Sequence, residues 1–432
     1  MGDSDKQVWL VLSHIFNMDG RASSQTITDK IPHFLKLGIQ PIVVSAAMGN
    51  KDKVLEHHQV LPALPVALRF DLRHYLRQRI SSRILYRIAM TLISLVLLPF
   101  YLIEKLLIPI ETSWSWAISA YFAGARVIKT RKPRLIYSAG GAYAAHLAGY
   151  WLKLRFGLPW IAEIHDPMTF SGQTTNKTRT RFSIWLEGKI CKHADVAFWF
   201  TEKALAQARA RHPELGDRGH CLLPGANEPE FPRVPYQRGK HLVISYFGSL
   251  ADTRNLGVFM QGLRKFVEKD PQRAEQTRLQ LYGGGIDPVS ARALREFPYP
   301  SMIEQFGRLE TDPKTGESGR ERVLKRMNAA DSLLLLHGTV PFCEQYIPSK
   351  MYEYLWTQRP ILALVWRNPH MERMLRELGH WSVTADDVDA IAAALEELHT
   401  RWLQDDLADS GKPSPYTVEA AVRQVIAWAN AI

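Results

Sequence analysis

The feature that most constrains the fold of this chain is a repeated alternation of short apolar runs with segments of helical spacing. The runs expected to form strands in the first half are residues 8–12, 41–45, 135–138, 158–164 and 194–200. Helices are expected at 24–37 and 142–156, and Gly38 and Gly157 follow them as helix stops. Short apolar strands that alternate with helices indicate parallel sheets covered on both faces.

The alternation starts again after residues 223–239, a stretch with Pro and Gly that is typical of a linker. The strands expected in this second half are 242–247, 279–282, 302–306, 332–336 and 359–364. We therefore predict an α/β fold with two Rossmann-like domains facing a central cleft, at 1–228 and 240–412, and a closing helix in 413–432. In such sheets ligands bind beyond the carboxyl ends of the strands.

Composition limits the environment and the partners of the chain. The formal net charge of +11 favours a negatively charged partner, which is a membrane surface, a nucleic acid or a phosphorylated substrate. The cysteines Cys191, Cys221 and Cys343 are far apart and form no CxxC pair, so they predict neither a zinc site nor a disulfide framework. The N-terminus runs directly into a strand and lacks the regions of a signal peptide, so we expect a cytoplasmic protein.

Residues 69–110 interrupt the alternation. Arginine recurs every few residues at Arg69, Arg73, Arg77, Arg79, Arg83 and Arg87. An uncharged run at 88–103 follows, shorter than the roughly 20 residues that span a bilayer. A basic helix followed by an apolar helix predicts a segment that lies in the interface of an anionic membrane. The alternatives are a buried helical hairpin with solvated arginines and a true transmembrane span. Trp114 and Trp116 are either interfacial anchors or core residues.

The stretch Tyr346-Ile-Pro-Ser-Lys-Met-Tyr-Glu-Tyr-Leu355 predicts a loop followed by a helix that begins at Pro348 or Ser349. The free N–H groups of a helix N-terminus bind anions, and Lys350 opposes the helix dipole unless an anion binds there. Glu353 lies on the same side of the helix one turn later. Phosphate donors beside a carboxylate suit a nucleotide-sugar diphosphate. The alternative is a helix packed on a sheet with Lys350 and Glu353 in solvent.

Together, several motifs resemble bacterial glycosyltransferases of the GT-B fold, specifically the retaining family 4. These motifs are Leu135-Ile-Tyr-Ser-Ala-Gly-Gly-Ala-Tyr-Ala-Ala-His146, Gly157-Leu-Pro-Trp-Ile-Ala-Glu-Ile-His-Asp166, Tyr246-Phe-Gly-Ser-Leu250 with Arg254-Asn255, Tyr282-Gly-Gly-Gly285 and the stretch around Lys350. Polysaccharide-assembly members with an Ile-Pro-Ser-Lys-like motif resemble the chain more closely than the general signature does. The resemblance makes 1–228 an acceptor domain and 240–412 a nucleotide-sugar domain, with 413–432 crossing back onto the first.

The resemblance also implies roles in donor binding. Arg254 and Lys350 are expected to stabilise the leaving diphosphate, and Glu353 to accept hydrogen bonds from ribose hydroxyls. Further donor contacts are expected from Gly20, Gly248, Gly284, Gln345 and Ser349. The family often has a second glutamate before Glu353, but Gln345 occupies that position here, with Glu344 beside it.

For the acceptor and the transferred sugar, the resemblance points to the ends of strands in the first domain. His165 is expected to donate to a sugar hydroxyl, and Asp166 to orient the acceptor or act as a base. Gly140, Gly141 and His146 are expected to contact the acceptor, although His146 is equally explained by packing. No carboxylate pair with metal-ligand spacing stands out, so neither a metal nor a cofactor is expected.

The predicted function is a retaining glycosyltransferase on the inner face of the plasma membrane, in exopolysaccharide or surface polysaccharide biosynthesis. Its expected partners are a UDP- or GDP-linked sugar, a polyprenyl diphosphate-linked saccharide and, through residues 69–110, an anionic membrane. Nucleic acid is not expected, because the basic residues form no recognised motif. The alternatives are a non-catalytic, degenerate glycosyltransferase that docks at the membrane and a nucleotide-sugar epimerase of the GT-B fold.

Overall fold

The chain forms two compact units. The computed structural model describes residues 6–18, 21–108, 110, 113–140, 143–170, 177–231, 235–407 and 411–432. Unit 1 comprises Met1–Pro224 with Val418–Ile432, and unit 2 comprises Gly225–Thr417. Gly20 and Gly141, two of the predicted site residues, lie outside the described residues.

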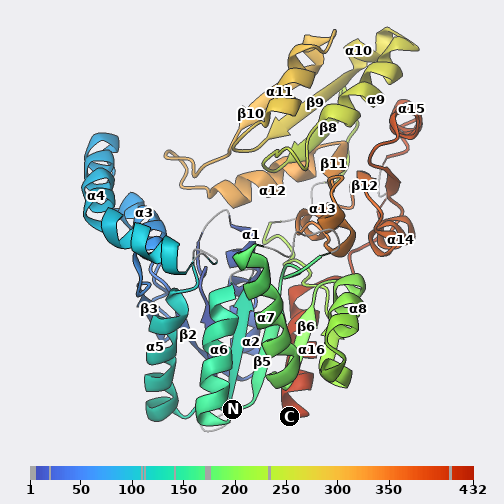
Figure 1. The fold of residues 1–432 in the computed structure, drawn as a ribbon. Coiled ribbons are helices and arrows are strands. Elements are labelled where there is room, and N and C mark those ends of the chain that lie inside the picture. The colour runs from blue at the N-terminus through green and yellow to red at the C-terminus, as the bar shows by residue number, and fades with distance from the viewer. Residues whose placement is uncertain are drawn as a thin grey trace. The chain divides into compact units, whose positions relative to one another are not determined.

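Unit 1 is built on a seven-stranded sheet with the order β3-β2-β1-β4-β5-β6-β7, in which every pair is parallel (Figure 1). The strands are β1 (Gln7–Ser13), β2 (Ile39–Ala46), β3 (His57–Val60), β4 (Leu135–Gly140), β5 (Trp160–Ile164), β6 (Val196–Trp199) and β7 (Gly219–Cys221). All five strands expected in this half are present. The pattern missed β3, because its sequence His-His-Gln-Val is polar, and β7, because it has only three residues.

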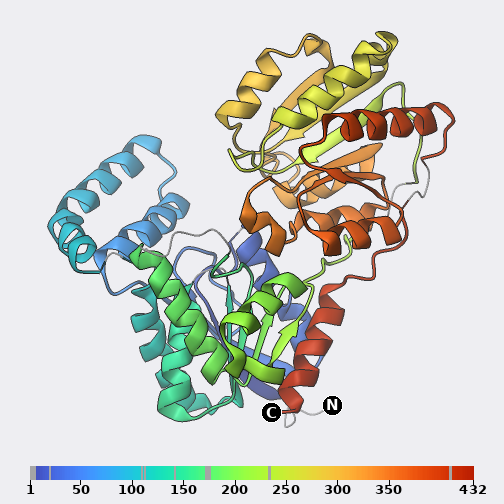
Figure 2. The ribbon, with the colours of Figure 1, turned by 45° about the vertical axis from the view of Figure 1, so that its right-hand side comes forward.

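Helices cover both faces of this sheet. They are α1 (Ala22–Thr28), α2 (Ile31–Lys36), α5 (Trp116–Arg131), α6 (Tyr143–Phe156), α7 (Thr178–His193), α8 (Glu202–Arg211) and α16 (Val418–Asn430), with the 3-10 turn η2 (Pro213–Arg218). Side chains alternate along β1, so that Leu10 packs with α5 and α6 while Trp9 packs with α2 and α16. The closing helix α16 therefore belongs to the core of unit 1 (Figure 2).

The single helix expected at 24–37 is wrong, because the chain breaks there into α1 and α2. Pro32 stands in the first turn of α2, and a proline, which has no N–H to donate, favours the start of a new helix. Lys30 lies at the break, between the two helices, and its side chain is fully buried. The break therefore supplies one of the buried charges of unit 1.

Residues 65–107 form a helical hairpin, α3 (Pro65–Arg79) and α4 (Arg83–Leu107), that stands out from the rest of unit 1 (Figures 1 and 2). The buried-hairpin alternative is wrong, since the apolar side chains of α4 are exposed, with Leu95 at 61% and Val96 at 69%. Among the helices of the described ranges, α4 alone is long and apolar enough to cross a membrane, by length and composition.

Buried polar contacts nevertheless join the two helices of the hairpin to each other and to the rest of unit 1. The buried Glu104 carboxylate of α4 accepts a hydrogen bond from the Val66 N–H of α3 at 2.8 Å. The buried Asp71 of α3 lies 3.3 Å from His14, the residue that follows β1. Trp116, at the start of α5, is fully buried in the core and is therefore no interfacial anchor.

Unit 2 has a six-stranded parallel sheet with the order β10-β9-β8-β11-β12-β13. The strands are β8 (Leu242–Phe247), β9 (Thr277–Tyr282), β10 (Ile303–Gly307), β11 (Ser332–Leu336), β12 (Ile361–Val365) and β13 (Trp381–Thr384). The five expected strands are present, and only β13, which is half exposed, was missed.

The helical elements of unit 2 complete two layers around its sheet. They are α9 (Gly257–Glu268), α10 (Gln272–Gln276), α11 (Pro288–Arg295), α12 (Gly319–Ala329), α13 (Lys350–Thr357), α14 (Pro369–Glu377) and α15 (Val388–Leu403), with the 3-10 turns η3 (Pro300–Met302) and η4 (Pro341–Gln345). Helices α9 and α15 pack together with one face of β8, through residues such as Phe259 and Leu395. The carboxyl ends of β8, β9, β11 and β12 lie at one edge of the sheet, because all of these strands are parallel.

Candidate functional site

The first candidate region is the carboxyl edge of the sheet in unit 2, where the turns after β8 and β9 lie in close contact. A side-chain carbon added at Gly283 would lie 2.0 Å from the Gly248 carbonyl oxygen, so only glycine fits there. Gly248 in turn donates its N–H to the Tyr282 carbonyl at 2.8 Å. Gly284 is exposed, and an added carbon there would meet only the Ser249 hydroxyl, at 3.9 Å. The two turns therefore leave open space at this edge.

Arg254 folds back over the end of β8. Its backbone pairs with Ala251 in a tight turn, and its guanidinium donates to the Ser249 carbonyl at 3.0 Å. Burial lowers the pKa of this guanidinium, but the neighbouring phenol oxygens of Tyr246 and Tyr346 outweigh that effect and raise the pKa. Its Nε–H is buried and has no hydrogen-bond partner among the described residues. Arg254 is thus a half-buried cation with a donor left over for a ligand.

The helix α13 begins at Lys350, directly after the exposed Ser349, and so confirms the helix predicted from this stretch. Lys350 forms an ion pair with Glu353 one turn later. Glu353 is only 8% exposed, and its other oxygen lies 3.9 Å from the guanidinium of Arg320 on α12. The alternative of two solvated side chains is therefore wrong. Glu353 instead sits between two cations, Lys350 and Arg320, which together outweigh its single negative charge.

The loop that joins β11 to α13 is held by a neutral histidine. Burial lowers the pKa of His337 to about 4. Its Nδ1 accepts from the Trp366 N–H at 3.2 Å, and its Nε2–H donates to the Tyr346 carbonyl at 2.9 Å. Gln345 is buried in this loop, at the position where the family often has glutamate. Glu344 points instead towards Arg367, 3.8 Å away.

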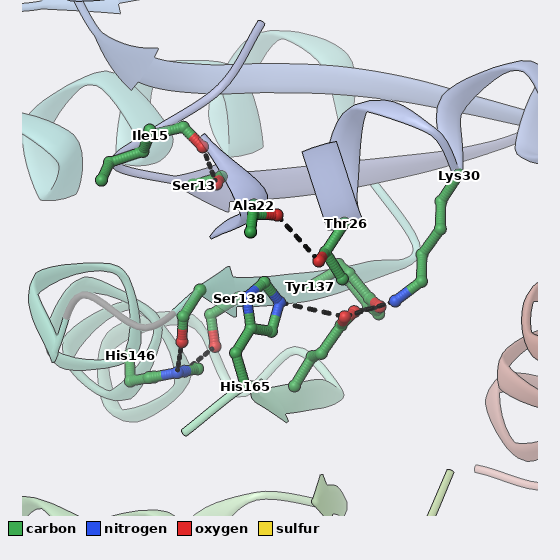
Figure 3. Close-up of polar contacts among 11 residues, drawn as sticks. Ser13, Ile15, Ala22, Thr26, Lys30, Tyr137, Ser138, His146 and His165 are labelled. Atoms are coloured by element: carbon green, nitrogen blue, oxygen red, sulfur yellow. Dashed lines mark hydrogen bonds and ion pairs between the residues drawn. The ribbon is translucent and has the colours of Figure 1, made fainter. Parts of the chain in front are cut away.

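The second candidate region is the carboxyl edge of the sheet in unit 1, where His165 and the exposed Asp166 follow β5. The His165 ring and Lys30 approach a common carboxylate (Figure 3). This carboxylate belongs to Glu163. His165 Nε2 lies 3.1 Å from Glu163 Oε1, the oxygen that also accepts from Lys30, while the Tyr137 hydroxyl donates to Oε2. Lys30, Tyr137 and Glu163 are all fully buried.

His146 belongs to a separate, fully satisfied group. Its Nδ1 accepts from the Ser138 hydroxyl at 2.9 Å, and its Nε2–H donates to the Gly140 carbonyl at 3.3 Å (Figure 3). Burial lowers the pKa of the ring to about 4, which keeps it neutral. Gly140 has a φ of +141°, a value that favours glycine, so His146 braces a special turn at the end of β4. Its contact with an acceptor stays a prediction, and both ring nitrogens already have partners.

Several residues of these two regions were not expected from the sequence. They are Lys30, Tyr137, Glu163, Tyr246, Arg320, His337 and Tyr346. Glu163 had a signal of its own, since it is the one charged residue of β5, a strand that is otherwise apolar. Lys30 had none, because it lies 133 residues away from Glu163. Within the described residues, no group of three or more His, Cys, Asp or Glu side chains is placed to hold a metal ion.

Comparison with known proteins identifies part of the chain. Residues 99–220 match the model of the glycosyl transferase 4-like domain, and all of them lie in unit 1, the unit that contains His165. No curated protein sequence matches the chain. The chain thus carries a glycosyltransferase domain of the family 4-like type, as the sequence motifs predicted.

Solved structures share the two-domain architecture. TarM superposes with a TM-score of 0.66 at 8% identity, covering 98% of this chain and 99% of that chain, and a structure of an S. aureus TarM mutant contains UDP. Sucrose-phosphate synthase from Thermosynechococcus elongatus superposes with a TM-score of 0.61 at 13% identity, covering 99% of this chain and 97% of that chain. A putative UDP-N-acetylglucosamine 2-epimerase from Listeria monocytogenes superposes with a TM-score of 0.52 at 13% identity, covering 98% of this chain and 95% of that chain. The predicted GT-B fold is therefore confirmed.

Proposed function

We propose that this chain is a retaining glycosyltransferase that moves a sugar from a UDP- or GDP-linked donor to a polyprenyl diphosphate-linked saccharide. The reaction takes place at the cytoplasmic face of the plasma membrane, in exopolysaccharide or surface polysaccharide biosynthesis. The bond between the anomeric carbon and the donor phosphate oxygen breaks, and a bond to the acceptor oxygen forms on the same face of the sugar. The acceptor hydroxyl loses its proton, and the nucleoside diphosphate leaves.

One observation carries the proposal, namely that the half-buried Arg254 at the carboxyl edge of unit 2 has a buried Nε–H without a hydrogen-bond partner in the part of the chain that the structure describes. Hydrogen bonds from a cation to phosphate oxygens are strong, and an arginine presents its donors in a fixed fork. Lys350 at the start of α13 adds a second cation and the N-terminus of a helix. This set of donors supports a diphosphate as the ligand, and stabilising the charge that develops on it is the largest expected contribution to catalysis.

The α3–α4 hairpin supports a lipid-linked acceptor and a membrane surface. Its apolar helix is exposed along almost its whole length, and α3 carries Arg69, Arg73 and Arg77 on its exposed surface. A contiguous exposed apolar surface marks a membrane or protein interaction site. Arginines beside this apolar surface favour an anionic membrane, because each one near the membrane surface contributes about 1 kcal/mol to the binding free energy. We place α4 in the membrane interface, with α3 and α4 joined to each other by Glu104 and α3 held near the end of β1 by Asp71.

The family 4-like domain supports the retaining outcome, and unit 1 supplies groups for the sugar and the acceptor. His165 contacts a hydroxyl of the transferred sugar. Asp166, which is exposed directly after it, orients the acceptor hydroxyl. Neither role needs a metal ion, because Arg254 and Lys350 supply the positive charge at the diphosphate.

The direct test is transfer from radiolabelled UDP- and GDP-sugars in the presence of a polyprenyl diphosphate saccharide, with hydrolysis measured when the acceptor is left out. We expect transfer from at least one donor, and NMR of the product should show the anomeric configuration of the donor. An inverted product would contradict the retaining reaction. Neither transfer nor hydrolysis with any donor would favour the degenerate docking protein, whereas a donor epimerised at the sugar would favour the epimerase.

Membrane binding is tested separately by flotation with liposomes that contain anionic lipid. The full chain should float, and a variant with Leu92, Leu95, Val96 and Leu102 all replaced by serine should stay in solution. These side chains are exposed, so their replacement leaves the core of unit 1 intact. Equal flotation of both proteins would contradict the assignment of α4 to the membrane interface.

A further inference from the structure

A buried carboxylate organises the carboxyl edge of unit 1. Glu163 is the only charged residue of β5, and it is 0% exposed. Three groups converge on its two oxygens, namely the Lys30 ammonium, the Tyr137 hydroxyl and the Nε2 of His165 (Figure 3). They come from three separate parts of the chain: the break between α1 and α2, strand β4 and the end of β5.

Glu163 is ionised at neutral pH. Burial raises the pKa of its carboxyl, but the charge of Lys30 and the hydrogen bond from His165 outweigh this and bring the pKa to about 2. Burial raises the pKa of the Tyr137 hydroxyl well above its usual value, so that this group stays protonated and donates a hydrogen bond to Glu163. A buried charge is tolerated only when it is paired and hydrogen-bonded, and Glu163 meets both conditions.

An ionised carboxylate accepts hydrogen bonds and donates none. The proton between Glu163 Oε1 and His165 Nε2 therefore belongs to the histidine. In the neutral form of the ring, which has only one N–H, the Nδ1 of His165 then carries a lone pair and is an acceptor. The ring is also held in place by stacking on Phe200, with centroids 5.0 Å apart.

This Nδ1 is buried and has no hydrogen-bond partner among the described residues, and the whole His165 residue is only 9% exposed. A buried polar atom that has no hydrogen bond destabilises the fold. The neighbouring buried histidine, His146, has partners for both of its nitrogens. The Nδ1 of His165 is therefore left to accept from a hydrogen-bond donor outside the described residues.

We propose that Glu163 is a positioning residue that fixes His165 as the Nε2–H tautomer, so that Nδ1 accepts a hydrogen bond from a hydroxyl of the transferred sugar. Lys30 is the counter-ion that keeps the carboxylate charged in the core. The identity of the ligand rests on the proposed function, but the role of Glu163 does not. The assignment also reverses the role expected from the sequence, in which His165 was a donor.

The test is the nitrogen NMR spectrum of the full chain labelled with [15N]histidine, in which His165 is assigned by its loss in the variant His165→Asn. The wild-type protein should show the Nε2–H tautomer. The double variant Lys30→Met/Glu163→Gln removes both charges together, so it leaves no unpaired charge in the core. It should populate the Nδ1–H tautomer. An Nδ1–H tautomer in the wild type, or an unchanged tautomer in the double variant, would overturn the proposal.

Ligand binding gives a second readout. A UDP- or GDP-linked sugar should shift the Nδ1 resonance of His165, while the nucleoside diphosphate alone should leave it in place. A shift with the nucleoside diphosphate alone, or no shift with a nucleotide sugar that binds, would contradict the sugar contact. If no nucleotide sugar binds, the proposed function fails, whereas the tautomer experiment still decides the role of Glu163.

The turnover kinetics of the variants distinguish a positioning role of Glu163 from a role in folding alone. The double variant should lose about 10- to 100-fold in kcat with a nearly unchanged KM for the donor, the loss typical of removing a partner that orients a functional imidazole. The matched control Lys36→Met/Glu419→Gln removes an exposed ion pair of the same unit and should change neither tautomer nor kcat. If the double variant does not fold, Glu163→Asp serves instead, because it keeps the charge but withdraws the carboxylate from Nε2. It should give the same change of the His165 tautomer and the same loss in kcat.

Discussion

The carboxyl edges of the two sheets use charge in opposite ways. In unit 1 the charges of Lys30 and Glu163 are fully buried and cancel each other, and His165 takes its orientation from that pair. In unit 2, Lys350 and Arg320 flank the carboxylate of Glu353, and their side chains are 35% and 40% exposed.

The difference shows what each edge is suited to bind. A neutralised, buried network holds a side chain in one orientation, which is useful for a neutral ligand such as a sugar hydroxyl. A partly exposed excess of cations attracts an anion, and part of its charge stays uncompensated until that anion binds. The comparison therefore supports our proposal of sugar positioning by unit 1 and diphosphate binding by unit 2.

The largest expected effect breaks the pair in unit 1. Replacing Lys30 by methionine leaves the Glu163 carboxylate buried without its cation, which should cost about 3–5 kcal/mol of unfolding free energy. The control Lys36→Met breaks an ion pair with Glu419 in which Lys36 is 65% exposed, and it should cost less than about 1 kcal/mol. Urea unfolding monitored by tryptophan fluorescence measures both. Equal losses in the two variants would contradict the distinction between buried and exposed charge.

A somewhat smaller effect concerns pH, and it should be common to both units. Burial lowers the pKa of His146 in unit 1 and of His337 in unit 2 to about 4, so between pH 6.5 and 4 the unfolded chain binds more protons than the folded one. Stability present above pH 6.5 should fall as the pH is lowered, by up to about 3 kcal/mol for each histidine. Urea unfolding at a series of pH values measures this loss of unfolding free energy. His146→Gln or His337→Gln should remove the part of the loss that comes from the replaced histidine. A stability independent of pH in this range would contradict the assignment of neutral, buried rings.

The smallest of these effects tests the cation excess in unit 2. Lys350→Ala should raise the KM for the nucleotide sugar by about 10- to 100-fold, the equivalent of one lost hydrogen bond to a charged group. Lys325→Ala is the control, because Lys325 also lies in unit 2 and pairs with Glu317 and Glu321. Steady-state transfer kinetics measure both variants. An unchanged KM in Lys350→Ala would mean that this lysine serves only to pair with Glu353.

Much of the fold was predictable because it follows from local patterns. Short, mostly apolar runs marked the strands that are buried on both faces, such as β8 and β11. The strand β3 was missed because its polar residues carry no such pattern. The break between α1 and α2 was missed although Pro32 marked it, because the helical spacing continues across the break.

The candidate site was predictable only in part. Arg254 stands in one short motif, and Lys350 and Glu353 stand in another. Each motif can be recognised from neighbouring residues alone. The partners of Glu163 and Glu353 lie on other elements, and only the packing of the sheet brings Lys30 to Glu163 and Arg320 to Glu353. A charged residue inside an apolar strand, as at Glu163, is the local signal that such a distant partner exists.

The account depends most on Arg254 as the residue that binds the diphosphate of the donor. Its most direct test is the dissociation constant of UDP and of GDP, measured by calorimetry for the wild type, Arg254→Ala and the control Arg292→Ala, whose arginine is exposed on α11 and pairs with Glu296. We predict that Arg254→Ala binds the preferred nucleotide at least about tenfold more weakly, while the control binds it like the wild type. Equal affinity in all three proteins would contradict the account.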